Sequence, residues 1–149
     1  MREYTRSLIF QKTVASRQKE YSMTLKMYQI TDFPSFFEKV RAQKLNFKTS
    51  YRLTLLAQEI EKHINFYQEN FRNILTEYGK KDENGNFVPT ADGQGILLLE
   101  DKTEEAYAKL NELRELEVEL PDTKFSVDEF EKIELSPVEM TIIIPFIEE

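Results

Sequence analysis

The sequence contains no cysteine, a single histidine and no long apolar run, and each of these absences excludes a class of protein. Without cysteine there is no thiol nucleophile, zinc–thiolate site or disulfide. The longest apolar stretches, Ile96–Leu99 and Ile142–Ile144, are far shorter than the ~20 residues that cross a bilayer. The first residues, MREYTRSLIF, have neither a long apolar core nor a small-residue cleavage site. We therefore expect a cytoplasmic protein with no secretory signal and no membrane partner.

Catalytic motifs are equally scarce. Glycine-rich nucleotide-binding patterns and the GxSxG of serine hydrolases do not occur, so His63 alone would have to support histidine-based chemistry. His63 lies one predicted helical turn from Glu59 and Tyr67, where a packing contact is the commoner arrangement. Two pairs of acids have a spacing that glycosidases could use, but 27 acidic residues make chance pairs frequent. These pairs are Glu117 with Glu119 and Glu131 with Glu134. We therefore predict that the protein is not an enzyme, and we assign it no catalytic, cofactor-binding or metal-ligating residue.

The net charge of −7 conceals an uneven distribution along the chain. Residues 1–52 contain 11 Lys and Arg against four Asp and Glu, whereas residues 53–149 contain 9 against 23. A basic N-terminal part can bind nucleic acid, but its charges are scattered and no nucleic-acid-binding motif accompanies them. Attraction between the two parts of the chain is the simpler account. We therefore do not expect nucleic acid as a partner.

Residues 1–22 differ from the rest of the chain in their weak periodicity and lack of helix caps. The dipeptide Lys19-Glu20 is what the codons AAG-GAG encode, and this ribosome-binding sequence lies two codons before Met23. We hypothesise that native translation starts at Met23, so that residues 1–22 are an extension and residues 23–149 form a single α+β domain. N-terminal sequencing that finds Met1 or Arg2 at the start of the native protein would contradict this hypothesis.

A long helix over about residues 50–78 is the strongest prediction. Apolar residues recur there at alternating spacings of four and three, without an interrupting proline or glycine. They are Leu53, Ala57, Ile60, Ile64, Tyr67, Phe71, Ile74 and Tyr78. Leu56 and Leu75 widen the stripe, as is typical of a helix packed inside a globular domain. Gly79 is expected to end this helix as a left-handed C′ glycine.

Shorter elements surround the long helix. Alternation from Tyr21 to Met27 predicts a half-buried strand, and a helix then runs to about Lys44 with Thr31 or Asp32 as its cap. A second helix over about 102–116 should be capped by Asp101 or Thr103 and pack antiparallel against the long one. Its expected apolar side comprises Ala106, Tyr107, Leu110, Leu113 and Leu116.

The last third of the chain predicts two strands and a C-terminal helix. The strands are placed at 117–120 and 132–135, with a Ser126/Glu129 capping box between them. Ser136-Pro137 starts a C-terminal helix with Met140, Ile143, Ile144 and Ile147 on its apolar side and a kink at Pro145. The predicted fold is therefore α+β, with a long helix antiparallel to a shorter one, a small antiparallel sheet and a C-terminal helix.

The segment KKDENGNF at residues 80–87 raises the question of a metal site. Counted as an EF-hand loop from Asp82, it places Phe87 where a glycine is required and Gly93 where a glutamate is required. Asn84-Gly85 is instead the preferred pair of a type I′ turn. We therefore predict a small exposed β-hairpin, with no metal or cofactor.

Two stretches support a resemblance to a known family. YGKKDENGN at residues 78–86 and EVEL at residues 117–120, in this order of elements, resemble a family of small proteins of unknown function from tailed phages and prophages of Gram-positive bacteria. The resemblance covers about residues 23–149. It implies a viral origin, a site of action inside the bacterial host cell and a non-enzymatic task. It assigns no catalytic or ligand residue.

These observations lead us to expect a phage accessory or assembly protein that acts through protein–protein interaction. The partner would be a phage or host protein, bound by the acidic helical face, or a second copy of the chain. An alternative is an acidic anti-defence inhibitor that mimics DNA and binds a host nuclease, which the acids after residue 52 favour. A second alternative is nucleic-acid binding through the basic N-terminal part.

Overall fold

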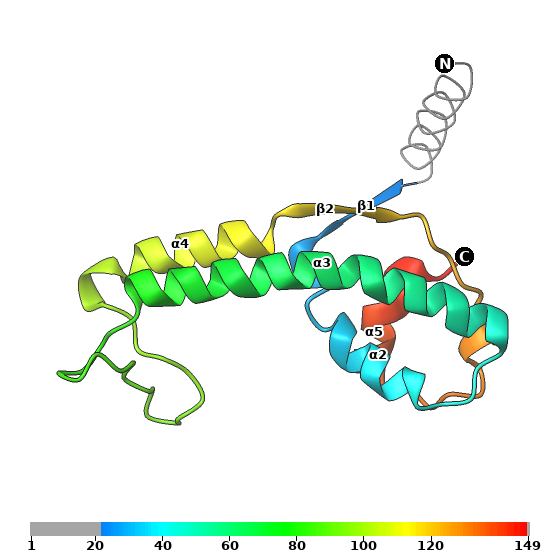
Figure 1. Cartoon of the computed structure of the whole chain (residues 1–149), viewed down its shortest axis with the longest axis horizontal. Coiled ribbons are helices and arrows are strands. Elements are labelled where there is room, and N and C mark those ends of the chain that lie inside the picture. Colours follow the sequence, from blue (N-terminus) through cyan, green and yellow to red (C-terminus); the bar gives the residue numbers. More distant parts are fainter. Residues whose placement is uncertain (1–21, 149) are drawn as a thin grey trace, which may run out of the picture.

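A computed structural model describes residues 22–148, and its longest element, α3 (Phe47–Tyr78), extends through most of the length of the molecule (Figure 1). Helix α4 (Thr103–Arg114) runs antiparallel beside the C-terminal half of α3. Helix α2 (Phe33–Arg41) packs on α3, and α5 (Pro137–Ile143) packs on α2. The α+β prediction is therefore confirmed. The proposed extension lies outside the described residues, apart from Ser22.

The sheet of the described residues has two strands, β1 (Ser22–Lys26) and β2 (Glu117–Pro121). They are antiparallel, with Leu25 opposite Val118, and both of these side chains are buried. The strand predicted at 132–135 is wrong, because the chain there is a turn followed by coil. Ile133 is buried and its N–H donates to the Phe130 carbonyl at 3.0 Å. The apolar alternation at 132–135 therefore reflects a loop packed on the core.

The core lies around the N-terminal half of α3, where the predicted stripe is best covered. Leu53, Ile60 and Ile64 are buried there, together with side chains from α2, the sheet and the C-terminal segment. Aromatic rings join these elements, with the Phe33 and Phe146 centroids 5.9 Å apart. Beyond Ile64 the stripe is less enclosed: Tyr67, Phe71 and Ile74 are half-buried, and only Tyr78 is fully buried.

The start of α3 lies before residue 50 because of a cap that the periodicity did not reveal. The Asn46 side chain accepts a hydrogen bond from the Thr49 N–H at 2.8 Å, which satisfies one of the free amides of the first turn. Phe47 therefore belongs to the helix, although it lies before the predicted start at about residue 50.

The side-chain cap predicted for α2 does not form. Asp32 occupies the N-cap position without a side-chain hydrogen bond to the helix, and the Thr31 hydroxyl donates to the Tyr28 carbonyl at 3.2 Å. This carbonyl belongs to the 3₁₀ turn η1 (Met27–Gln29), so Thr31 closes the preceding turn instead.

The caps and both ends of α4 also differ from the prediction. Asp101 lies in a 3₁₀ turn, η2 (Glu100–Lys102), and the Thr103 hydroxyl donates to the Leu99 carbonyl at 2.9 Å. The helix ends at Arg114, and the Leu116 carbonyl accepts the Met27 N–H at 2.8 Å. Leu116 therefore bonds to the first residue of η1 instead of extending the helix. Leu116 and Tyr107, both predicted on the apolar side, are exposed.

Residues 79–99 form the looped connection between α3 and α4, which we call the excursion (Figure 1). Lys81 and Phe87 pair across the predicted hairpin. The turn is not type I′, because only Gly85 and Gly93 have positive φ among the described residues and Asn84 does not. Asp82 stabilises a different turn here, because its carboxylate accepts the N–H groups of Asn84 at 2.9 Å and Asn86 at 3.0 Å.

Gly79 ends α3 for a reason other than a left-handed backbone. Its φ of −73° is one that any residue adopts. A Cβ at this position would lie 2.4 Å from the Leu75 carbonyl oxygen and 2.8 Å from the Phe87 ring. Glycine is therefore required because a Cβ would collide with the backbone of the last turn of α3 and with the Phe87 ring of the excursion.

The C-terminal segment confirms the Ser136 cap but differs from the prediction beyond α5. The Ser136 hydroxyl accepts the Glu139 N–H at 3.2 Å, and Glu139 accepts the Ser136 N–H at 3.0 Å. The helix then ends at Ile143 and a 3₁₀ turn, η4 (Ile144–Phe146), takes its place at Pro145. As a result Ile144 is exposed, and Phe146 enters the core.

Candidate interaction surfaces

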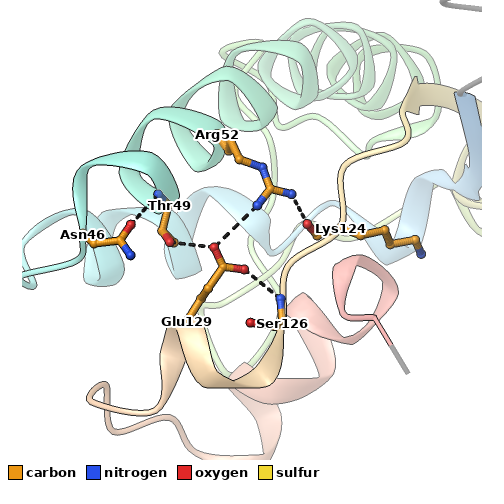
Figure 2. A network of polar contacts seen from close by, with 6 residues as sticks. All are labelled: Asn46, Thr49, Arg52, Lys124, Ser126 and Glu129. Atoms are coloured by element: carbon orange, nitrogen blue, oxygen red, sulfur yellow. Dashed lines mark hydrogen bonds and ion pairs between the residues drawn. The ribbon is translucent and has the colours of Figure 1, made fainter.

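A polar network fastens the N-terminal end of α3 to the segment 124–129 (Figure 2). Its centre is Glu129, in the 3₁₀ turn η3 (Val127–Phe130). One carboxylate oxygen accepts the hydroxyl of buried Thr49 at 2.7 Å, and the other accepts the Ser126 N–H at 2.7 Å. Arg52 lies 3.5 Å from the same carboxylate and also donates to the Lys124 carbonyl. These contacts fix the orientation of the first turns of α3.

Glu129 is held in its ionised form by this network. Partial burial acts to raise its pKa, but the hydrogen bonds from Thr49 and Ser126 and the charge of Arg52 outweigh burial. The net effect lowers the pKa of Glu129 below its ordinary value. A carboxyl group that stays ionised and saturated with donors is suited to a structural role and poorly suited to general acid catalysis.

Ion pairs join the basic part of the sequence to the acidic part. Among residues 22–148, three of the five ion pairs join a basic residue before position 53 to an acid after it. They are Lys26–Glu115, Lys39–Glu139 and Arg52–Glu129. The hydrogen bond from Lys39 and those from Ser136 lower the pKa of Glu139 to about 2. In the described part of the chain, the basic and acidic parts therefore attract each other.

The face of α3 that points away from the core carries a second apolar row, which we call the outer stripe: Phe47, Tyr51, Leu55 and Phe66. The first three recur every four residues, and a helix of 3.6 residues per turn places all four opposite the buried stripe. Phe47 is 87% exposed and Tyr51 59% exposed. Their rings stack on each other with centroids 6.5 Å apart. No described segment of the chain covers this row.

The sequence did not predict the outer stripe, because the predicted long helix began at about residue 50 and left Phe47 out. The spacing of Phe47, Tyr51 and Leu55 was a usable signal once Asn46 is recognised as the cap. Leu55 also lines a hollow of about 320 Å³ between α3 and the end of β2, next to Pro121. Apolar side chains and a neighbouring hollow are common features of surfaces that bind another protein.

A groove of about 450 Å³ lies between α2 and α3. Its floor is apolar and includes Phe37, Ala57 and Ile64, whereas its rim is polar and includes Glu61 and Gln68. It opens beside the outer stripe, since Gln58 lines both the groove and the hollow near Leu55.

Of the residues considered for catalysis, the structure brings His63 next to the backbone of Glu119. His63 Nε2 lies 3.2 Å from the Glu119 carbonyl oxygen, so its ring joins α3 to β2. Glu117 and Glu119 are exposed on one face of β2, and Glu131 and Glu134 are exposed in a turn and the coil after it. Residues 22–148 contain no group of three or more His, Asp or Glu side chains arranged to hold a metal ion.

Comparison with known proteins adds no relative. No family model, curated protein or solved structure matches this chain. Within the described range, none of the helices combines the length and apolarity that a bilayer crossing requires. The surfaces of the molecule are therefore the basis for a proposed function.

Proposed function

We propose that the protein is a non-enzymatic phage accessory or assembly factor that binds another protein through the outer stripe of α3. The observation that carries this proposal is the exposure of Phe47 and Tyr51, stacked on each other at an end of α3 that is otherwise firmly anchored. Exposed aromatic side chains on a rigid support give large contact area for little loss of conformational entropy on binding. The resemblance to small phage proteins supports a site of action inside a bacterial cell.

The surface charge supports this proposal better than its alternatives. Exposed acids of the described chain occur on α3, α4, β2 and the C-terminal segment and are not concentrated on a single element. Among the described basic residues before position 53, Lys26, Lys39 and Arg52 are engaged in ion pairs with acids, which leaves fewer charges for nucleic acid. Apolar contact through the outer stripe therefore has the most support.

Site-specific photocrosslinking tests the proposal. A photoreactive phenylalanine analogue in place of Tyr51 should crosslink to one defined protein in cells that express the gene naturally. The same analogue at Tyr107, which is 61% exposed on α4, is the matched control and should give no such product. Failure to crosslink at Tyr51, or equal products from both positions, would remove the support for this surface.

A further inference from the structure

We propose that the outer stripe of α3 is the interface of a homodimer, in which two copies of α3 pack antiparallel about a two-fold axis between Leu56 and Ala57. This inference rests on the proposed function and names the partner as a second copy of the chain. A two-fold interface requires a surface that is complementary to itself. The outer stripe meets this requirement when Phe47 lies opposite Phe66 of the second copy.

The self-complementary register follows from the positions of the exposed side chains. Placing Phe47 opposite Phe66 of the second copy pairs two exposed aromatic rings. The same register places Tyr51 opposite Lys62 of the second copy, where the ammonium can lie over the ring. Near the axis it brings Leu55 opposite Gln58, whose aliphatic stem can cover the leucine. Each residue of the row therefore meets an aromatic ring, a cation that can lie over a ring, or an aliphatic stem.

The charges of α3 select the antiparallel arrangement. From Phe47 to Gln58 the helix has Lys48 and Arg52 and no acid, whereas from Glu59 to Tyr78 it has four glutamates against one lysine and one arginine. No acid lies in the first turn and no basic residue in the last, so these charges reinforce the helix dipole instead of offsetting it. An antiparallel copy places the positive end over the negative half, and a parallel copy would place like charges together.

The two ends of the dimer interface show the same charge complementarity. In the proposed register Lys48 lies opposite Asn65 of the second copy, about 6 Å along the axis from Glu69 of that copy. Lys48 and Glu69 are both exposed, and neither belongs to an ion pair within residues 22–148. The dimer interface would therefore gain two symmetry-related attractions between Lys48 and Glu69.

The area of the dimer interface determines the expected affinity of the dimer. Residues Phe47–Phe66 span about 30 Å of helix, and a contact about 10 Å wide covers roughly 300 Å² on each copy. The total is well below the ~1,200 Å² of a standard stable interface. We therefore expect a weak, reversible dimer that forms as the concentration rises toward ~1 mM.

Single-cysteine crosslinking tests the register directly, because the natural chain has no cysteine. In the proposed dimer the two copies of Gln58→Cys lie about 5 Å apart along the helix axis, whereas those of Glu69→Cys lie about 38 Å apart. Under mild oxidation, Gln58→Cys should form a disulfide-linked dimer at least ~10-fold faster than Glu69→Cys, because the latter can react only by random collision. Equal rates, or faster crosslinking of Glu69→Cys, would overturn the register.

Charge exchange provides a second test without cysteine. Lys48→Glu and Glu69→Lys should each raise the dissociation constant in sedimentation equilibrium, and the double variant should restore it. Phe47→Ser should weaken the dimer by ~10-fold or more, while Val138→Ser, an exposed apolar residue on α5, should leave it unchanged. A chain that stays monomeric to ~1 mM would refute the homodimer. If that monomer still crosslinked at Tyr51 to a different protein, the proposed function would stand with another partner.

Discussion

The substitution Thr49→Val isolates one hydrogen bond of the network at the start of α3. Thr49 is 1% exposed, and its hydroxyl donates to the Glu129 carboxylate at 2.7 Å. Valine has nearly the same shape without the donor, and a hydrogen bond to a charged group contributes ~1.5–3 kcal/mol in general. The Glu129 side chain is 21% exposed, so water compensates part of the loss. We therefore expect the free energy of unfolding to fall by ~1–2 kcal/mol.

Urea unfolding at neutral pH, followed by far-ultraviolet circular dichroism, measures this change. The matched control is Thr54→Val, because the exposed Thr54 hydroxyl donates only to the Ser50 carbonyl of the same helix at 2.8 Å. This control should alter stability by less than ~0.5 kcal/mol. A decrease for Thr49→Val no larger than that of the control would refute the assignment of the network.

The pH dependence of the stability difference between the natural chain and Thr49→Val is a more specific test of the network. Although partial burial opposes it, the network lowers the pKa of folded Glu129 below the ordinary value of 4.5. A lowered pKa gives stability that is complete above the unfolded pKa and is lost as the pH falls through the folded pKa. Thr49→Val raises the folded pKa toward 4.5, so the gap between the two proteins should be largest at neutral pH and shrink below pH 4.5. A gap of constant size down to pH ~3 would contradict this reasoning.

Three further predictions concern other contacts. The pKa of Glu139 is about 2 because Lys39 and Ser136 donate to it, so the melting temperature should fall between pH 4.5 and about 2, and Lys39→Met should flatten that fall. Gly79→Ala should destabilise the chain by ~1–3 kcal/mol in urea, because its Cβ would clash with backbone, whereas Gly95→Ala meets nothing closer than 3.5 Å and should be tolerated. Phe146→Ala should cost ~3–5 kcal/mol in the same assay, since the ring is fully buried; a loss below ~1 kcal/mol would show that it is not part of the core.

The parts of the fold that the sequence predicted are those with local, repeated signals. The stripe from Leu53 to Tyr78 and the Ser136 cap depend on residues within a few positions of each other, and both were predicted correctly. The atoms that crowd Gly79 belong to a helical turn and to a loop residue outside any periodic pattern, and Phe146 lies beyond a break at Pro145, so periodicity reports neither feature. A loop that buries alternate residues imitates a strand for the same reason.

The candidate surface was harder to predict than the fold. Periodicity identifies the row of residues that is covered, because that row is long and regular. An exposed row is shorter, and its apolar residues are interspersed with those of the buried row in the same helix, as Tyr51 and Leu55 are here. Only the position of the cap at Asn46 shows that Phe47 belongs to that row.

The arrangement of the core has a consequence for how the molecule opens. The main apolar cluster takes its α3 residues from between Leu53 and Ile64 and contains none from residues 79–117. That far region therefore relies on a separate small set of contacts centred on Tyr78, Ala106 and Leu113. Such an outlying region can lose its protection against hydrogen exchange while the remainder stays folded. The chain should therefore tolerate a reporter or an insertion within the excursion far better than at any point beside Leu53.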